Sequence, residues 1–328
     1  MTQSLLDSYH RHIDYMRISV TDRCNLRCIY CNASAMQHLS HDDILRYEEI
    51  ERVVHAAAHL GVTSIRLTGG EPTVRPHVAE LVKLIRAIPG IEDISMTTNA
   101  TRLAEMAQEL KDAGVSRVNI SLDTFKPERF TAMCGAGRLE DVLAGIEAAK
   151  KAGLNPVKIN TVVLRGVNDD EVVDFARKSV SDGWHVRYIE EMPLVGDANG
   201  HKMVSIDEIR AKIERELGDL EPCFPTHNGH GPAKYYKIPG STGSIGFIGP
   251  VTDCFCDSCN RFRLTADGKL RPCLLRDDEV DLKVPLRNGA STEELEALMR
   301  QTAAMKHERH QLADNISPHG RNMRQIGG

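Results

Sequence analysis

Short runs of apolar and β-branched residues recur through the first 190 residues, and each is followed by a helical pattern or by a loop leading to one. The runs read IDYMRISV, TSIRLTG, DISMTTN, SRVNISLD, PVKINTVVL and HVRYIEEM, a pattern that predicts strands. The helical segments, several of which end near a glycine, are Tyr47–Leu60, His77–Ile88, Arg102–Ala113, Leu139–Ala152 and Asp169–Ser181. Alternating strands and helices predict an α/β fold with a parallel sheet.

Six such units are too few for a closed eight-unit barrel. We therefore expect an open partial (βα)6 TIM-like barrel with its site at the C-terminal ends of the strands. After a helix near Ile206–Leu217, the segment EPCFPTHNGHGPAKYYKIPGSTG is rich in Pro and Gly and has no helical period. This change predicts a domain boundary near residue 220, with a barrel over 1–220 and a smaller C-terminal domain over 221–328. In the latter, a helix is expected to start at Ser291, with Glu294 completing a capping box.

The composition of the chain argues against nucleic-acid binding and against insertion in a membrane. The chain has 328 residues, 41% of them hydrophobic, and a net charge of -5. Its Lys and Arg residues are spread along the chain, which gives no reason to expect a nucleic-acid partner. The first fifteen residues lack a signal-like apolar run, and no stretch approaches the ~18 apolar residues of a membrane span. We therefore expect a cytoplasmic protein with no membrane partner.

The chain has nine cysteines, which are the leading candidates for functional residues. Structural disulfides are not expected in the reducing cytosol, so metal or redox chemistry is the leading interpretation. Six of the nine fall into two trios: Cys24, Cys28 and Cys31, and then Cys256, Cys259 and Cys273. Cys134, Cys223 and Cys254 are left over.

The first trio, Cys24, Cys28 and Cys31, follows the first predicted strand directly. Three thiolates can ligate a [4Fe–4S] cluster and leave one iron open, whereas structural zinc usually takes four protein ligands. The alternative from spacing alone is a zinc site completed by His38 or His41.

A second motif, Gly69-Gly70-Glu71-Pro72, ends the second predicted strand, and glycine suits a backbone that approaches a ligand closely. Together the two motifs resemble the radical S-adenosylmethionine superfamily. That resemblance implies that the open iron chelates S-adenosylmethionine, that an electron from the cluster cleaves it to a 5'-deoxyadenosyl radical, and that the Gly70-Glu71 motif holds the methionine amino group.

The second trio lies in the stretch FCDSCNRFRLTADGKLRPC and predicts a second cluster with an open iron. Zinc with a histidine as fourth ligand is the alternative. Arg261 and Arg263 alternate on one predicted strand face, which suits an anion, although a solvated face is the plainer interpretation. Arg17, Arg66 and Lys158 lie within largely apolar strands, where an anionic ligand explains them better than core packing.

This second cysteine stretch, with TDRCNLRCIYC, RLTGGEP, TTNA, SLDT, KINTVVLRGVNDDE, IEEMP and the terminal Gly-Gly, is similar to the GTP 3',8-cyclase family of molybdenum cofactor biosynthesis. The resemblance implies that the second cluster binds the guanine of GTP. Positions matching GTP contacts are Arg17, Arg66, Thr97, Lys158, Arg261 and Arg263. Positions matching S-adenosylmethionine contacts are Tyr30, Gly70, Ser121 and Met192.

In that family the radical takes hydrogen from C3' of the GTP ribose, C3' bonds to C8, and reduction yields 3',8-cyclo-7,8-dihydro-GTP. The implied partners are cyclic pyranopterin monophosphate synthase and an electron donor such as flavodoxin or ferredoxin, and a homodimer is also open. No residue stands out as a catalytic acid. The alternatives are another two-cluster radical enzyme, such as a peptide-modifying maturase, or a non-enzymatic zinc-binding adaptor.

Two departures from the family pattern stand out. Asn32 and Ala33 follow Cys31 where Met-Pro is common, and Cys254 stands where proline is common. We expect Cys254 to be a small buried side chain rather than a ligand, and Cys134 and Cys223 to be inert. In the family a terminal Gly-Gly tail, here Gly327-Gly328, enters the active-site cavity near the substrate.

Overall fold

The computed structural model describes residues 4–31, 38–192, 203–224, 231–312, 320–321 and 323–327. All six predicted strands are present: β1 (Tyr15–Ser19), β2 (Ser64–Thr68), β3 (Asp93–Thr98), β4 (Arg117–Ser121), β5 (Lys158–Val163) and β6 (His185–Glu190). The predicted helices are also present: α1 (Tyr47–His59), α2 (Val78–Arg86), α3 (Leu103–Ala113), α5 (Leu139–Lys151), α6 (Val172–Ser181) and α7 (Ile206–Leu217). A further short helix, α4 (Pro127–Cys134), follows β4 and was not predicted.

The C-terminal part of the chain extends the same sheet at both of its edges. Its elements are β7 (Glu221–Pro222), β8 (Lys234–Lys237), β9 (Ser244–Ile248), β10 (Arg261–Leu264), β11 (Lys269–Arg271), β12 (Val280–Asp281), α8 (Lys283–Arg287) and α9 (Thr292–Ala304). The strand order is β12-β11-β10-β1-β2-β3-β4-β5-β6-β9-β8-β7, with β10 parallel to β1 and β9 parallel to β6. Hydrogen bonding thus crosses residue 220, and the two-domain boundary stays a prediction. The Ser291 capping box with Glu294 is present at the start of α9.

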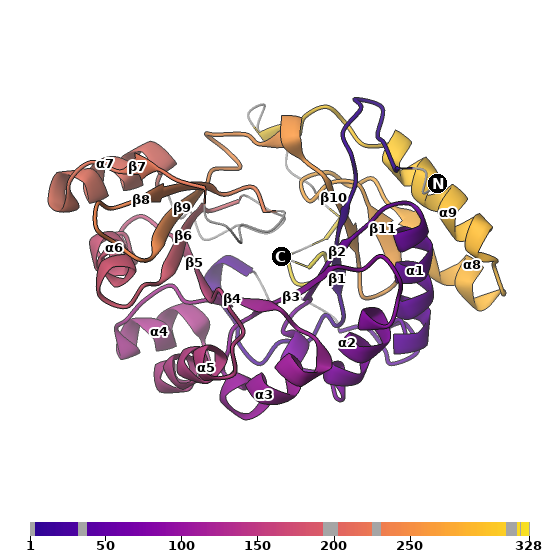
Figure 1. Cartoon of the computed structure of the whole chain (residues 1–328), viewed down its shortest axis with the longest axis horizontal. Coiled ribbons are helices and arrows are strands. Elements are labelled where there is room, and N and C mark those ends of the chain that lie inside the picture. Colours follow the sequence, from indigo (N-terminus) through magenta and orange to yellow (C-terminus); the bar gives the residue numbers. More distant parts are fainter. Residues whose placement is uncertain are drawn as a thin grey trace.

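The described sheet is open and curved, since β12 and β7 are its two edges. Figure 1 shows helices α1 to α7 around the outside of the arc, with the C-terminal tail reaching its centre. The predicted open partial barrel is therefore confirmed.

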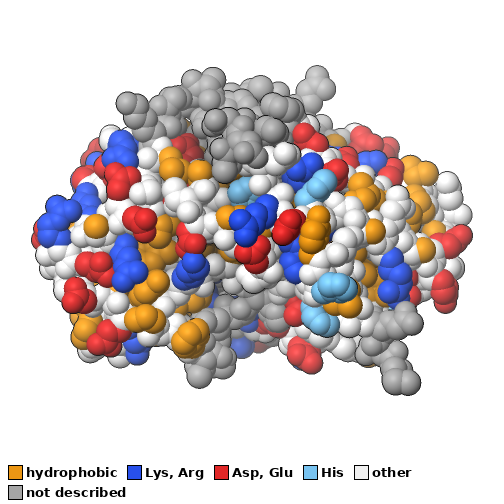
Figure 2. All heavy atoms as spheres, turned by 90° about the horizontal axis from the view of Figure 1, so that it is seen from above, with side chains coloured by type: hydrophobic (Ala, Val, Ile, Leu, Met, Phe, Trp, Pro, Cys, Tyr) orange, Lys and Arg blue, Asp and Glu red, His pale blue; other side chains and the backbone are white. Residues whose placement is uncertain are grey.

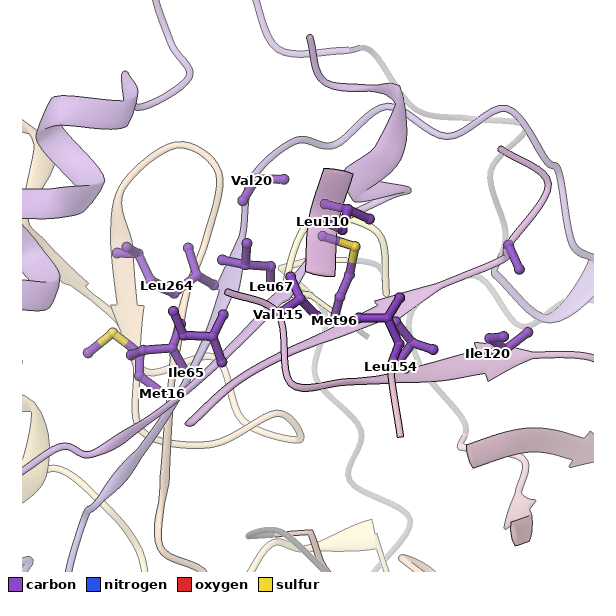
Figure 3. Close-up of a cluster of buried hydrophobic side chains, with 14 of the residues drawn as sticks. Met16, Val20, Ile65, Leu67, Met96, Leu110, Val115, Ile120, Leu154 and Leu264 are labelled. Atoms are coloured by element: carbon purple, nitrogen blue, oxygen red, sulfur yellow. The ribbon is translucent and has the colours of Figure 1, made fainter. Parts of the chain in front are cut away.

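Each barrel strand separates apolar and polar side chains by its two-residue period. In β2, Ile65 and Leu67 point toward the outer helices and are fully buried. Figure 3 shows them packed with residues of neighbouring strands, including Met16, Met96 and Leu264. The alternate positions of the same strands carry polar groups, which leaves a polar concave face.

The outer surface mixes charges of both signs. On the face in Figure 2, basic and acidic side chains are interspersed, with hydrophobic side chains scattered between them. In the described part of the chain, no helix has the length and apolarity that crossing a bilayer requires.

The apolar layer between sheet and helices should carry much of the stability. We expect Ile65→Ala to lower the free energy of unfolding by about 2–5 kcal/mol, because the side chain is fully buried and its loss leaves a cavity. Val180→Ala is a matched control, since Val180 is 48% exposed and its change should stay within about 0.5 kcal/mol. Anaerobic urea unfolding measures both, and equal effects would contradict this packing.

Candidate active site

Polar side chains form a continuous row on the concave face, because the parallel strands are in register. Arg17 of β1 is paired with Arg66 of β2 on one side and with Arg263 of β10 on the other. Across the barrel, Asn160 of β5 is paired with Arg187 of β6. Sheet register thus brings residues that are far apart in sequence to one surface.

The basic members of this row are deeply buried. Arg66, Arg187 and Arg263 are 5%, 2% and 5% exposed. Burial lowers the pKa of Arg263 to about 10, assisted by the charge of Arg261. Burial also lowers the pKa values of Arg17 and Arg66, again with neighbouring arginines adding to the effect. Six arginines and four carboxyl groups line the cavity, so arginine is the commonest charged residue in it.

Arg66, Arg187 and Arg263 donate hydrogen bonds to neutral acceptors. Arg66 Nε donates to Ser95 Oγ at 3.1 Å, Arg187 donates to Asn119 Oδ1 at 2.6 Å, and Arg263 donates to a backbone carbonyl. The buried Nε atoms of Arg187 and Arg261 have no hydrogen-bond partner within the described residues. Buried cations with unused donors fit an anionic ligand, because an unpaired buried charge is costly.

The first cysteine trio lines one side of this cavity. Cys31 N donates to the carbonyl of Cys28 at 3.0 Å in a short turn, and Leu26 N lies 3.4 Å from Cys24 Sγ. Backbone and side-chain N–H groups directed at sulfur suit thiolate ligands of a cluster. His38 Nδ1 lies 3.3 Å from Asp22 Oδ2, so its ring faces a carboxylate.

Glycine is required where the second motif meets the loop before Cys24. Gly70 N donates to Thr21 O at 2.7 Å, and Glu71 N donates to Arg23 O at 2.8 Å. A Cβ on Gly70 would lie 2.2 Å from Arg23 O, and one on Gly69, whose φ is +151°, would lie 2.5 Å from Thr21 O. The two motifs are therefore held together by backbone contact that a side chain would prevent.

The carboxylate of Glu71 fixes this junction. Its Oε1 accepts from Thr73 N at 3.0 Å, Thr73 Oγ1 at 2.6 Å and Thr98 Oγ1 at 2.6 Å, and its Oε2 accepts from Asn99 N at 2.6 Å. Burial raises the pKa of Glu71, although these hydrogen bonds act in the opposite direction. Both oxygens are engaged by the protein, which supports a positioning role. Its contact with S-adenosylmethionine stays a prediction.

Tyr30 is oriented by a carboxyl group that the sequence patterns did not reveal. Its hydroxyl donates to Asp123 Oδ2 at 2.7 Å, and Val162 N donates to Asp123 Oδ1 at 2.8 Å. Burial raises the pKa of Asp123 to about 7. Tyr30, Asp123, Ser121 and Met192 all line the cavity.

The second cysteine trio is held from the C-terminal side by Lys306, which is 3% exposed. Lys306 Nζ lies 3.3 Å from Cys259 Sγ and donates to the carbonyl of Pro272, next to Cys273, at 2.6 Å. Burial opposes ionisation of Cys259, but Lys306 and Arg261 outweigh it and lower the pKa of this thiol to about 7. A thiolate at neutral pH suits metal ligation.

The C-terminal tail reaches the cavity. Arg324 is 4% exposed, lines the cavity and donates to the carbonyl of Leu26 beside the first trio. Gly327 O accepts from Arg263 at 2.8 Å, and a Cβ on Gly327 would lie 2.8 Å from Thr68. This placement agrees with the expectation for the tail. Gly328 lies outside the described residues.

Thirteen of the predicted site residues line this one cavity: Arg17, Cys24, Cys28, Tyr30, Cys31, Arg66, Gly70, Glu71, Thr97, Ser121, Met192, Arg261 and Arg263. Lys158 instead lines a second cavity with His185, at the N-terminal ends of β5 and β6. It still lies within electrostatic reach of Arg187 and Arg66. Cys256, Cys259 and Cys273 are outside the residues lining the first cavity.

Several residues of the site were missed from the sequence. Arg187 and Asn160 alternate with apolar residues in their strands, so the reasoning that selected Arg66 could have found Arg187. Lys306 and Arg324 carry no comparable local signal, because their contacts join distant parts of the chain.

The expectation for Cys254 needs correction, whereas the expectation that Cys134 and Cys223 are inert stays a prediction. Cys254 is exposed, so the expectation of a small buried side chain is wrong; it lies in a surface loop after β9. Cys134 is the last residue of α4, and its buried thiol hydrogen-bonds with that of Cys28. Cys223 lines the second cavity. Asn32 and Ala33 lie outside the described residues.

Comparison with known proteins identifies the family. The radical SAM superfamily model matches residues 18–178, and the Molybdenum Cofactor Synthesis C model matches residues 184–312. The chain is 48% identical to the GTP 3',8-cyclase of Pelotomaculum thermopropionicum, over 98% of this chain and 99% of that protein. The chain belongs to the GTP 3',8-cyclase family. The GTP 3',8-cyclase of Heliobacterium modesticaldum is 47% identical over 99% of this chain and 100% of that one.

The family assignment confirms the resemblance inferred from the sequence. Among solved structures, Streptococcus suis SuiB bound to S-adenosylmethionine has a TM-score of 0.64 at 13% identity, covering 89% of this chain and 69% of that one, which shows a shared fold. Membership of the GTP 3',8-cyclase family, with its radical SAM segment, implies a [4Fe–4S] cluster and S-adenosylmethionine. Cys24, Cys28 and Cys31 fit that cluster, since they line the cavity beside the Gly69-Gly70 junction.

The Gly70 junction should control the first cluster of this GTP 3',8-cyclase relative. We expect Gly70→Ala to lower the iron content after anaerobic reconstitution by about four per chain, because its Cβ would displace the loop that leads to Cys24. Gly90→Ala is the control: its φ of +91° makes alanine cost about 1 kcal/mol, but nothing lies within 4 Å. A full iron complement in Gly70→Ala would contradict this role.

Proposed function

We propose that this chain is a GTP 3',8-cyclase that converts GTP to 3',8-cyclo-7,8-dihydro-GTP, the first step of molybdenum cofactor biosynthesis. The proposal is carried by the buried basic row on the concave face, whose arginines bond to neutral acceptors. A triphosphate supplies several negative charges and many acceptor oxygens. Charge-assisted hydrogen bonds to it from Arg66, Arg187 and Arg263 would compensate the burial of these cations.

In this proposal GTP lies with its phosphates along the basic row. Arg17, Arg66, Thr97, Lys158, Arg261 and Arg263 are the proposed GTP contacts, and Arg187 joins them on the strength of its free buried Nε. The unused Nε of Arg261 adds a donor at the edge nearest the second trio. Fixing both ends of the nucleotide holds its ribose in one orientation, which is the main contribution a binding site makes to a reaction between two parts of one molecule.

S-adenosylmethionine and the first cluster belong at the wall of the cavity that the first trio lines. Cys24, Cys28 and Cys31 would hold the cluster, and Tyr30, Gly70, Ser121 and Met192 would hold S-adenosylmethionine, with Glu71 and Asp123 fixing the positions of Gly70 and Tyr30. When bound, these groups supply the one-electron chemistry that removes a hydrogen atom from the substrate. The chain itself orients C3' toward that wall, and the inserted tail with Arg324 limits access of water.

A second [4Fe–4S] cluster on Cys256, Cys259 and Cys273 is part of the proposal. Support comes from the lowered pKa of Cys259 and from Lys306, which bridges Cys259 and the segment before Cys273. The open iron of that cluster would take the guanine. In the net reaction one electron and S-adenosylmethionine give methionine and 5'-deoxyadenosine, which carries away the hydrogen atom of C3'. The C3'–C8 bond forms, and a second electron from the external reductant and a proton complete the dihydro product.

The partners of this reaction are also proposals. They are an electron donor such as flavodoxin or ferredoxin, cyclic pyranopterin monophosphate synthase as consumer of the product, and a second copy of this chain as a homodimer. Each is consistent with a cytoplasmic enzyme of this family.

The function is tested by anaerobic incubation of the reconstituted protein with S-adenosylmethionine, dithionite and each of GTP, ATP, CTP and UTP. We expect 3',8-cyclo-7,8-dihydro-GTP from GTP alone, detected by mass spectrometry, and no product or 5'-deoxyadenosine from Cys28→Ala. Cys223→Ser, at a thiol that lines the second cavity and not the first, should retain product formation. S-adenosylmethionine cleavage without a cyclised nucleotide from any substrate would refute the cyclase assignment.

GTP binding should be coupled to proton uptake at Lys158. Burial, with the charges of Arg187 and Arg117, lowers the pKa of Lys158 to about 6, so its amine is mostly neutral at pH 7.5 before GTP binds. A nearby triphosphate favours the charged amine, so binding should take up as much as about one proton, and affinity should fall as pH rises above 6. Calorimetry in two buffers of different ionisation enthalpy measures this uptake.

Lys158→Met should abolish that proton uptake, whereas Lys237→Met, at an exposed lysine of the same second cavity, should preserve it. Equal uptake in the wild type and in Lys158→Met would place the titrating group elsewhere and remove Lys158 from the proposed contacts.

A further inference from the structure

A second ligand set lies against one residue of the C-terminal trio. Sulfur of Cys254, sulfur of Cys256 and a ring nitrogen of His310 all lie within 4.8 Å of one another. In a tetrahedral zinc site, Zn–S bonds of about 2.3 Å and Zn–N bonds of about 2.0–2.1 Å separate ligand atoms by roughly 3.4–3.8 Å. Small side-chain rotations would close this group around one ion.

Each member of the group is suited to ligation. Cys254 is exposed, which provides an entry path from solvent. His310 Nδ1 accepts a hydrogen bond from Leu312 N at 3.3 Å, so in the neutral ring Nδ1 carries the lone pair that a metal ion needs. The ring also hydrogen-bonds the backbone of Pro250, and a metal-binding histidine usually donates its second ring N–H to such a carbonyl.

The set shares only Cys256 with the trio. Cys259 and Cys273 are outside the 4.8 Å group, and Cys259 is held by Lys306. Two thiolates and a neutral imidazole match the Cys2His donor set with which zinc takes a water as fourth ligand. Their charge balances a divalent ion.

We propose that Cys254, Cys256 and His310 form a mononuclear zinc site in the chain that lacks its second cluster. The site shares Cys256 with the second trio but not Cys259 or Cys273, and it uses a cysteine that stands where the family commonly has proline. Cys256 cannot serve both a zinc ion and the proposed second cluster, so occupancy by one excludes the other. This exclusion rests on the proposed second cluster, whereas the zinc site itself does not.

Cobalt binding tests the site directly. The probe is Co²⁺, followed by back-titration with Zn²⁺, on anaerobic, chelator-treated full-length chain in which Cys24, Cys28 and Cys31 are replaced by alanine to silence the first trio. We expect one Co²⁺ per chain with a thiolate-to-cobalt charge-transfer intensity of two sulfurs. Circular dichroism of each variant checks that it remains folded.

Three further substitutions in that background assign the ligands. Cys254→Ser and His310→Gln should each weaken binding by more than ~100-fold, because even loss of an outer-shell partner costs roughly 10- to 100-fold. Cys259→Ser is the matched control and should leave affinity unchanged. If Cys259→Ser weakens binding as much as Cys254→Ser, the trio holds the ion and the proposal is wrong.

Iron loading separates this proposal from the proposed function. Without zinc, the triple-alanine chain should take up about four irons on reconstitution, and zinc preloading should prevent this unless Cys254→Ser is present. Failure to load iron in the absence of zinc would refute the second cluster while leaving the cobalt result standing. Iron loading unaffected by bound zinc would refute the shared use of Cys256.

Discussion

Several positive charges buried in one cavity, with neutral groups as their partners, are the constraint on which this structure depends. Arg66, Arg187 and Arg263 are fixed by Ser95, Asn119 and the carbonyl of Gly327 rather than by carboxylates. Such an arrangement is unfavourable in a free protein, because like charges repel and each has lost its water. The sheet supports it through the apolar packing of its other face, and an anion bound inside would relieve it.

A few buried polar groups also hold together the loops around the cavity. Glu71 ties the end of β2 to the end of β3, and the Gly70 backbone ties both to the loop before Cys24. From the other end of the chain, Lys306 and Arg324 donate to backbone carbonyls near the two cysteine trios. Cofactor loops that are irregular in themselves are therefore held by buried polar groups, each with several partners.

The sequence alone was enough to predict features that have a local periodic pattern or that involve rare residue types such as cysteine. Six strand runs, glycine-terminated helices and closely spaced cysteines predicted the partial barrel and both trios. The extra helix α4 was missed because its eight residues carry little periodic signal. Lys306 and Arg324 could not be identified, since a lone cation gives no indication of a carbonyl that only folding brings near it. The exposure of Cys254 was likewise decided by the path of a loop.

The pairing of β1 with β10 has a consequence for the order in which the protein is made. Tyr15 lies opposite Arg261, so the first barrel strand leaves the ribosome long before the strand that covers its outer edge. Until then, a buried strand of the finished sheet has one row of exposed backbone amides and carbonyls, the feature by which incomplete sheets aggregate. Because the C-terminal segment is synthesised last, each nascent chain passes through a period in which the edge of β1 is open to aggregation. Chaperone binding would matter most during that period.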